Sequence, residues 1–233
     1  MPVADIIVPV FNEEDILEQF YSRLGKLGLD LNLIFIDNGS IDSSLSILES
    51  FQDVTIIRHH SNEGYGSSLA DGMRHGSCEN IIIIDADCEY PPEAIPDILE
   101  ELRNSDIVYA SRLLDRKSAQ DANMPYIKLL GNRVISGLFN VLFGQNTTDL
   151  YTGCKGFKRQ CVKGVSFSRM GFEHVLEFAC ILSSRGYKIV DMPISYEPRN
   201  TGMSKMSHLS ETLKFLYVLA CMRIALSCNS KTK

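Results

Sequence analysis

The chain lacks the residue patterns of several protein classes. Its 233 residues contain no Trp, and its seven Cys are odd in number, scattered and without any C-x-x-C pair. We therefore expect neither a disulfide framework nor a zinc site, and this usage fits a reducing compartment. The N-terminus, Met1–Asp5, has no basic region and leads directly into a strand-like run, so we expect no signal peptide and a cytoplasmic location.

A hydrophobic run long enough to cross a membrane is also missing near the C-terminus. The uninterrupted apolar stretch there extends only from Phe215 to Met222, between Lys214 and Arg223, whereas a transmembrane helix needs about 20 apolar residues. Residues 206–233 instead predict an amphipathic helix and tail that follow a catalytic domain at 1–205. We expect this helix to lie on a membrane surface or to contact a membrane-embedded partner subunit. Packing against its own core is the alternative.

Basic residues are scarce in the first half of the chain. Residues 1–111 hold 5 Lys and Arg against 21 Asp and Glu, a net charge of -16, while residues 112–233 hold 18 against 8, a net charge of +10. An acidic half tolerates a metal ion, and a basic half attracts phosphates or an anionic membrane surface. Two solvated faces with no binding role are the alternative. No nucleic-acid partner is expected.

The chain does have the length and apolar content for one α/β domain, with or without an appendage. Short runs rich in Ile and Val alternate with segments of helical length, and this alternation predicts a Rossmann-like, largely parallel sheet flanked by helices. The predicted strands are Asp5–Val10, Leu31–Asp37, Val54–Arg58, Asn80–Ile84 and Asp106–Ser111. The predicted helices are Glu13–Leu24, Ser43–Phe51, Gly66–His75 and Glu93–Arg103. The loop Leu113–Asn123 is expected to be a lid, or a connection without function.

Polar residues and glycines follow the predicted strands where ligands of such sheets bind. Asp37 can accept hydrogen bonds from a base or ribose. Gly64 and Gly66 would let the backbone approach a nucleotide, and the N-terminus of the next helix offers N–H donors to an anion. A plain turn is the alternative for these glycines. The dinucleotide fingerprint is absent, because no G-x-G-x-x-G follows the first strand.

Carboxylates gather after the run of four Ile at 81–84. Two ionised carboxylates ~4 Å apart repel each other by roughly 4 kcal/mol at an effective dielectric constant of about 20. A site that contains Asp85, Asp87 and Glu89 therefore needs a cation, and hard oxygen ligands suit Mg²⁺ or Mn²⁺ that also bridges to substrate phosphates. An Asp-rich turn that caps the next helix is the alternative.

Several motifs occur in order along the chain. They are I-V-P-V-F-N-E-E from Ile7, D-N-G-S-I-D from Asp37, N-E-G-Y-G from Asn62, D-A-D-C-E-Y-P-P-E from Asp85, A-S-R ending at Arg112, G-N-R-V-I-S from Gly131, D-L-Y-T-G-C-K-G-F from Asp149 and R-N-T-G-M-S-K from Arg199. Together they resemble the family-2 glycosyltransferases of the GT-A fold. The similarity is strongest to the polyprenyl-phosphate branch, which includes dolichyl-phosphate mannose synthases and dolichyl-phosphate glucosyltransferases.

The resemblance implies a role for each matching residue. The nucleoside pocket would be lined by Pro9, Asn12, Glu13 and Asp37. Asp85 would contact the ribose or the diphosphate, and Asp87 with Glu89 would hold the metal. The donor diphosphate and the acceptor phosphate would be gripped by Arg112, Arg133, Arg199 and Lys205, whose charge suits phosphate oxygens. Asp149 would help to position the sugar or the acceptor.

The implied reaction is a metal-dependent, inverting transfer of a hexose. The donor would be a nucleotide-diphospho-sugar of the GDP-mannose or UDP-glucose type, and the acceptor a polyprenyl phosphate at the cytoplasmic face of a membrane. A glycan or soluble acceptor, or a non-catalytic nucleotide-sugar-binding protein, remains the alternative. The chain departs from the family pattern in three places: Asn38 stands where a second Asp is common, Glu89 where mannose synthases often carry Gln, and Cys154 where an aromatic residue is frequent.

Overall fold

The computed structural model describes residues 1–114, 126–195 and 208–229. Runs of branched apolar residues form the predicted strands, because Ile and Val fit a pleated surface that is buried on both sides. These strands are β1 (Ala4–Val10), β2 (Leu31–Asp37), β3 (Val54–Arg58), β4 (Asn80–Ile84) and β5 (Ile107–Ser111). Their bounds agree with the sequence prediction to within one residue. Arg199, Lys205 and most of the predicted lid lie outside the described residues.

Helices follow the first strands as predicted. They are α1 (Leu17–Gly25), α2 (Ser44–Ser50), α3 (Tyr65–His75), the 3₁₀ turn η1 (Pro92–Ala94) and α4 (Ile95–Glu101). The prediction that the first helix begins at Glu13 was wrong, because α1 begins four residues later. The Glu13 carbonyl accepts hydrogen bonds from Ile16 and Leu17, which form a turn, and the Glu13 N–H bonds to Ser44 Oγ at 2.8 Å.

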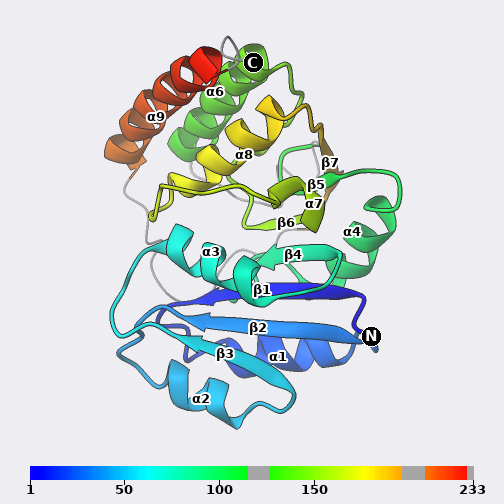
Figure 1. Ribbon diagram of the computed structural model, residues 1–233. Helices are drawn as coiled ribbons and strands as arrows, with labels where there is room; N and C mark the ends of the chain where they lie inside the picture. The colour runs from blue at the N-terminus through cyan, green and yellow to red at the C-terminus, as the bar shows by residue number, and fades with distance from the viewer. Residues whose placement is uncertain (115–125, 196–207, 230–233) are drawn as a thin grey trace.

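The second half of the chain completes the sheet and covers one of its faces. Its elements are α6 (Tyr126–Phe143), β6 (Cys154–Lys158), α7 (Arg159–Val162), α8 (His174–Ser184), β7 (Ile189–Pro193) and α9 (His208–Asn229). The described strands lie in the order β3-β2-β1-β4-β6-β5-β7 (Figure 1). β6 runs antiparallel to both β4 and β5, and the other pairs are parallel.

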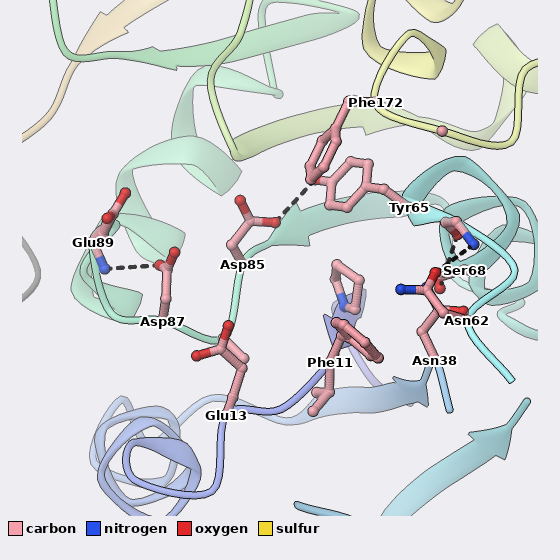
Figure 2. Close-up of a pocket in the computed structure, with 15 residues that line it drawn as sticks. Phe11, Glu13, Asn38, Asn62, Tyr65, Ser68, Asp85, Asp87, Glu89 and Phe172 are labelled. Carbon is pink, nitrogen blue, oxygen red and sulfur yellow. Dashed lines mark hydrogen bonds between the residues drawn. The ribbon is translucent and has the colours of Figure 1, made fainter. Parts of the chain in front are cut away.

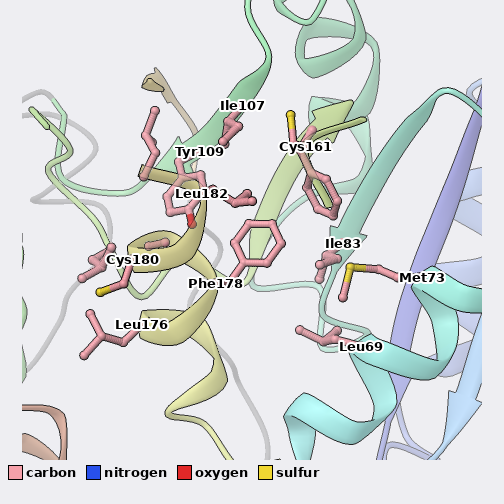
Figure 3. Packing of buried hydrophobic residues seen from close by; sticks show 14 of the residues in the cluster. Leu69, Met73, Ile83, Ile107, Tyr109, Cys161, Leu176, Phe178, Cys180 and Leu182 are labelled. Atoms are coloured by element: carbon pink, nitrogen blue, oxygen red, sulfur yellow. The ribbon is translucent and has the colours of Figure 1, made fainter. Parts of the chain in front are cut away.

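Alternate residues of each central strand enter two separate cores. In β4, Ile81 and Ile83 pack against α3 and α8, while Ile82 and Ile84 pack on the opposite face against α4. Figure 3 shows the first of these cores, where Phe178 and Leu182 of α8 meet side chains from α3 and β4. The predicted α/β class with a largely parallel, helix-flanked sheet is confirmed.

The C-terminal helix α9 is part of this packing. Its buried residues Phe215, Val218 and Leu219 belong to the same core as α8, and α9 lies beside α6 at one end of the molecule (Figure 1). Tyr217 and Ile224 on its other side are exposed. Among the described residues, no helix combines the length and the apolar character needed to span a bilayer.

Candidate functional site

A pocket of about 430 Å³ opens where the carboxyl ends of β1, β2 and β4 meet the N-terminus of α3. This position and volume are typical of ligand sites in parallel α/β sheets. Figure 2 shows carboxylates on one side of it, two side-chain amides on the other and Phe11 between them. The lining residues are Pro9, Val10, Phe11, Glu13, Asn38, Asn62, Gly64, Tyr65, Ser68, Asp85, Ala86, Asp87, Glu89, Gly171 and Phe172.

The carboxylate side contains all three predicted metal ligands. Asp85 accepts a hydrogen bond from Tyr65 Oη at 2.9 Å, and Asp87 Oδ1 accepts one from the Glu89 N–H at 3.0 Å. Burial and then the nearby charge of Asp87 raise the pKa of Asp85 to about 7. Cys88, which lies between Asp87 and Glu89 in the chain, has a φ of 57°, in the left-handed region that non-glycine residues rarely occupy. Such backbone strain is concentrated at functional sites.

These residues fit a hard divalent cation. They offer carboxylate oxygens from three half-buried side chains that face one pocket, and oxygen donors of this kind are preferred by Mg²⁺ and Mn²⁺. Burial is the main cause of the raised pKa of Asp85, and the negative charge of Asp87 adds to it; a cation would relieve this second contribution.

Gly153, at the entrance to β6, makes room for Asp85. A Cβ at this position would lie 2.1 Å from Asp85 Oδ2, so no other residue fits without moving the carboxylate. The Gly153 carbonyl also accepts a hydrogen bond from the Asp85 N–H at 3.3 Å. On the far side of the carboxylate, Tyr65 stacks on Phe172 with ring centroids 5.3 Å apart. Asp85 is thus positioned from two elements that are distant in the sequence.

Two residues predicted to line the nucleoside pocket instead support its loops. Asn12 joins the loops after β1 and β2: its N–H donates to Ser40 Oγ at 3.0 Å, and its Oδ1 accepts from the Ile41 N–H at 2.9 Å. Asp37 is buried and accepts from the Ser40 N–H at 3.1 Å. Neither side chain is among the pocket-lining residues, whereas Pro9, Glu13 and Gly64 are.

The expectation of a free helix N-terminus at α3 was wrong. The N–H groups of Gly66 and Ser67 both point to the Met170 carbonyl oxygen, at 2.7 and 3.3 Å. A Cβ on Gly64 would lie 2.2 Å from this oxygen. Gly64 and Gly66 therefore allow the backbone segment before α8 to pack closely against α3. Gly64 also lines the pocket. Sequence proximity to a helix did not reveal that another segment takes these donors.

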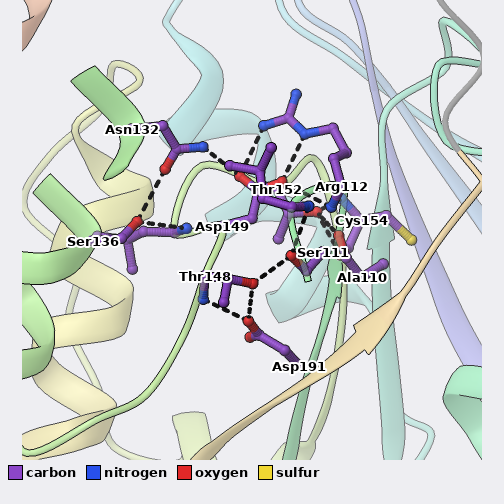
Figure 4. A network of polar contacts seen from close by, with 12 residues as sticks. Ala110, Ser111, Arg112, Asn132, Ser136, Thr148, Asp149, Thr152, Cys154 and Asp191 are labelled. Atoms are coloured by element: carbon purple, nitrogen blue, oxygen red, sulfur yellow. Dashed lines mark hydrogen bonds and ion pairs between the residues drawn. The ribbon is translucent and has the colours of Figure 1, made fainter. Parts of the chain in front are cut away.

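Beyond the pocket, Arg112 and Asp149 form a buried pair. Arg112 Nε and Nη2 donate to the two oxygens of Asp149 at 2.7 and 2.9 Å, and Asn132 of α6 adds a third bond at 2.7 Å (Figure 4). Burial alone would raise the pKa of Asp149, but the charge of Arg112 and the hydrogen bonds lower it. Asp149 is 0 % exposed and is not among the pocket-lining residues, so its contacts hold Arg112 and Asn132 of α6 in place.

Of the other predicted phosphate-binding residues, the structure describes Arg133. Arg133 is exposed on α6, next to the Asn132 that contacts Asp149. Arg199 and Lys205 lie outside the described residues.

Lys155 was missed because it lies in the middle of a short β6 segment with little apolar character. It is 1 % exposed, faces the core side between Ile83 and Tyr109, and its Nζ lies 5.2 Å from the Tyr109 ring centroid. Burial lowers the pKa of Lys155 to about 8, although the charges of Asp85 and Asp149 oppose this shift. Lys155 is thus a buried basic residue that interacts electrostatically with Asp85 and Asp149. In the sequence, only its position within D-L-Y-T-G-C-K-G-F could have suggested a role.

His59 was also missed. It is buried at the end of β3, with Nδ1 at 3.0 Å from Asn38 Oδ1 and Nε2 at 2.9 Å from Asp71 Oδ2. His59, Glu63 and Asp71 are close enough together to hold an ion, but both ring nitrogens already face hydrogen-bonding partners. The adjacent His59 and His60 after a strand form no motif that would identify a role for His59.

This chain belongs to glycosyl transferase family 2, whose family model matches residues 5–165. The matched segment contains β1 except its first residue, β2 to β6, and every described pocket residue up to Glu89.

Its relatives include enzymes named for lipid phosphates. A dolichol-phosphate mannosyltransferase of Pyrococcus furiosus is 27% identical over 93% of this chain, which spans 63% of that protein's length. A UDP-N-acetylglucosamine–dolichyl-phosphate N-acetylglucosaminyltransferase of Methanococcus voltae is 23% identical, with 94% of this chain and 95% of that protein covered. These matches agree with the predicted polyprenyl-phosphate branch.

A solved structure has the same fold. Glucosyl-3-phosphoglycerate synthase from Mycobacterium tuberculosis, crystallised with Mn²⁺, UDP and glucosyl-3-phosphoglycerate, superposes with a TM-score of 0.71 at 15% identity, covering 95% of this chain and 80% of the other. The GT-A-like fold of the present chain is thereby established.

Proposed function

We propose that the chain is a metal-dependent, inverting hexosyltransferase that moves a sugar from a nucleotide-diphospho-sugar to a polyprenyl phosphate. The single observation that carries this proposal is the pocket in which Asp85, Asp87 and Glu89 face a cleft at the carboxyl ends of β1 and β4. The donor would be of the GDP-mannose or UDP-glucose type. The names and coverage of the two relatives support the acceptor class.

At the donor end, a bound Mg²⁺ or Mn²⁺ would supply positive charge to the leaving diphosphate. Asp87 and Glu89 would hold it, with Asp85 either as a third ligand or against the ribose. Tyr65 donates to Asp85 Oδ1 and so holds this carboxylate at the wall of the pocket. Phe11 and Phe172 border the pocket and would limit the access of water to the anomeric carbon of a bound donor.

At the acceptor end, the Arg112–Asp149 pair would place one guanidinium for the lipid phosphate. Arg133, Arg199 and Lys205 would add charge around it. A phosphate monoester has a second pKa of about 6, so at neutral pH its oxygen is already anionic and attacks without a strong general base. Direct attack on the side of the sugar opposite the diphosphate inverts the anomeric configuration.

The exposed apolar surface of α6 and α9 supports peripheral attachment to a membrane. Its residues are Leu130, Val134, Leu138 and Val141 of α6 with Tyr217 and Ile224 of α9, hereafter the α6/α9 surface. Steps of three or four residues on α6, and of seven on α9, put them along one face of each helix. Arg133, Lys214 and Arg223 on the same two helices are also exposed. We propose that this surface rests on an anionic membrane at its cytoplasmic face, with residues 1–205 as the catalytic part and α9 within the attachment part at 206–233.

The decisive experiment measures sugar transfer into lipid. Radiolabelled UDP- and GDP-sugars are incubated with the purified chain, a polyprenyl phosphate in detergent and Mg²⁺ or Mn²⁺, and the label in the organic phase is counted. We expect metal-dependent transfer that Asp87→Asn lowers at least about a hundredfold, since the variant loses an ionised ligand. An unchanged circular dichroism spectrum of the variant excludes misfolding.

Other results would select the alternatives. Label that enters only water-soluble products would assign a glycan or soluble acceptor. Nucleotide-sugar binding without transfer to any acceptor would assign a non-catalytic binding protein.

A further inference from the structure

We propose that Ser111, Thr148 and Asp191 form a positioning chain that holds Arg112 where it meets the acceptor phosphate. The inference rests on the proposed function, in which Arg112 binds that phosphate. None of the three residues lines the pocket, so they act through Arg112 and not on the substrate. The chain links β5 and β7 to the loop before β6 (Figure 4).

The carboxylate of Asp191 determines the direction of the hydrogen bonds. Its Oδ2 accepts from the N–H and from the hydroxyl of Thr148, at 2.5 and 2.6 Å, and its Oδ1 accepts from Thr147 Oγ1 at 2.8 Å. Burial raises the pKa of Asp191, and these hydrogen bonds oppose that shift because they stabilise the ionised form. An ionised carboxylate can only accept, so the single hydroxyl proton of Thr148 points to Asp191.

The orientation of the Thr148 hydroxyl in turn orients Ser111. Ser111 Oγ lies 2.7 Å from Thr148 Oγ1, and because the Thr148 proton points to Asp191, Ser111 is the donor in this bond. The Ser111 oxygen then accepts from the Leu113 N–H at 3.1 Å. This last bond closes a turn around Arg112. The hydrogen bonds therefore run in one direction, from the Leu113 N–H to the carboxylate of Asp191.

The chain lies directly beside the Arg112–Asp149 pair. Ser111 precedes Arg112 in the sequence, as Thr148 precedes Asp149. The Arg112 N–H also donates to Asp149 Oδ2 at 3.1 Å, so the two segments are joined at two successive residues.

The position of Arg112 matters because its guanidinium lies close to the donor side. Its guanidinium carbon is 5.4 Å from the centroid of the Tyr90 ring, and Tyr90 directly follows Glu89 in the loop of the pocket carboxylates. Loss of the bond between Ser111 and Thr148 would free the turn around Arg112 and let the guanidinium shift away from this place. We therefore expect the positioning chain to affect acceptor binding more than donor binding.

The test removes single hydroxyl groups and keeps the side-chain shape. Thr148→Val deletes the central link of the positioning chain, and Thr148→Ser retains it. Thr147→Val is the matched control, because the Thr147 hydroxyl bonds to the same carboxylate through Oδ1, outside the chain. Steady-state transfer from a nucleotide-sugar to a polyprenyl phosphate with Mn²⁺ gives kcat and the KM of each substrate. Thermal unfolding followed by circular dichroism gives the melting temperature of each variant.

We expect Thr148→Val to raise the acceptor KM at least about tenfold, the effect of one lost buried hydrogen bond, and the donor KM less than about threefold. Thr148→Ser and Thr147→Val should keep both KM values within about threefold of the wild type, although Thr147→Val should lower the melting temperature about as much as Thr148→Val. Ser111→Ala removes the same bond from its other end, so its effect on the acceptor KM should not multiply with that of Thr148→Val in the double variant.

Three results would overturn the inference while leaving the proposed transferase intact: an unchanged acceptor KM in Thr148→Val, an equal rise in Thr147→Val, or an equal rise of the donor and acceptor KM values. If Thr148→Val does not fold, Ser111→Ala decides by the same criteria. Failure of the wild type to transfer sugar to any polyprenyl phosphate would overturn the proposed function and this inference together.

Discussion

The protonation of single residues in this site depends on neighbouring charges as well as on direct contacts. Asp85 lies at the end of a buried strand with Asp87 two residues on and Tyr65 donating to it. Lys155, buried in the neighbouring strand β6, is the counter-charge whose pKa the burial lowers to about 8. The resulting balance leaves Asp85 able to gain or lose a proton near neutral pH.

Metal affinity should therefore depend on pH in a defined direction. The pKa of Asp85 is raised to about 7 by burial and by Asp87, and a metal binds the ionised form, so acid conditions make the ion compete with a proton. Between pH 8 and pH 6 the ionised fraction of a group with this pKa falls about tenfold, and Mn²⁺ affinity should fall with it. Electron paramagnetic resonance of free Mn²⁺ measures this directly.

The Asp85→Asn variant is the control for that measurement. It should bind Mn²⁺ more weakly at pH 8 and with little change down to pH 6, because the titrating group is gone. Equal affinities of the wild type at the two pH values would show that Asp85 is not the proton competitor.

At the level of elements, β6 forms a wall beside Asp85 that the sequence did not predict. It brings Gly153 against Asp85, Lys155 into the core side and Gly156 against Ile98, where a Cβ would lie 2.4 Å from Ile98 Cγ2. The β4–β6 pairing is antiparallel, whereas the pairs among β1 to β4 are parallel. One element thus determines the space around the pocket carboxylate.

A methyl group at Gly153 should disturb the metal site without preventing folding. Its Cβ would lie 2.1 Å from Asp85 Oδ2 and 2.9 Å from Tyr90 Cε2, so Asp85 must shift. We expect Gly153→Ala to weaken Mn²⁺ binding at least about tenfold and to destabilise the fold by roughly 1–3 kcal/mol, as overpacking does. Gly137→Ala on α6 is the matched control, because nothing lies within 4 Å of its Cβ position.

Calorimetry and chemical denaturation report the two effects separately. A Gly153→Ala protein that is destabilised but binds Mn²⁺ like the wild type would show that Asp85 has no part in the metal site.

The sequence predicted the first half of the fold well because its signals are local. The Ile run of β4 and the acidic turn after it are adjacent in the chain, so both the strand and the pocket carboxylates followed from the pattern. β6 has Lys155 and Gly156 in its centre, and its burial depends on distant partners. The donors of α3 taken by Met170, and the support of Asn38 by His59, are likewise long-range contacts that no periodicity contains.

On the scale of the whole molecule, the division of charge and the exposed apolar residues of α6 and α9 favour the same orientation of the protein on a membrane. The N-terminal half carries the excess of acidic residues and the pocket carboxylates, and the C-terminal half carries the excess of basic residues and the α6/α9 surface. α6 also contacts the Arg112–Asp149 pair through Asn132. A membrane under α6 and α9 would therefore bring a lipid phosphate to the basic half of the molecule while the donor pocket stays open to water.

This orientation predicts which surface residues attach the protein to lipid. Val134→Glu on the α6/α9 surface replaces an apolar contact with a charge that anionic headgroups repel, and its binding to vesicles containing about a third phosphatidylglycerol should fall at least tenfold in sedimentation assays. Val3→Glu is the matched control, since both valines are 46% exposed and Val3 lies far from α6 in the sequence. Its binding should equal that of the wild type, and neither variant should lower the melting temperature by more than a few degrees, as surface substitutions usually do not. Equal loss in both variants would indicate non-specific adsorption, and full binding by Val134→Glu would remove α6 from the attachment surface.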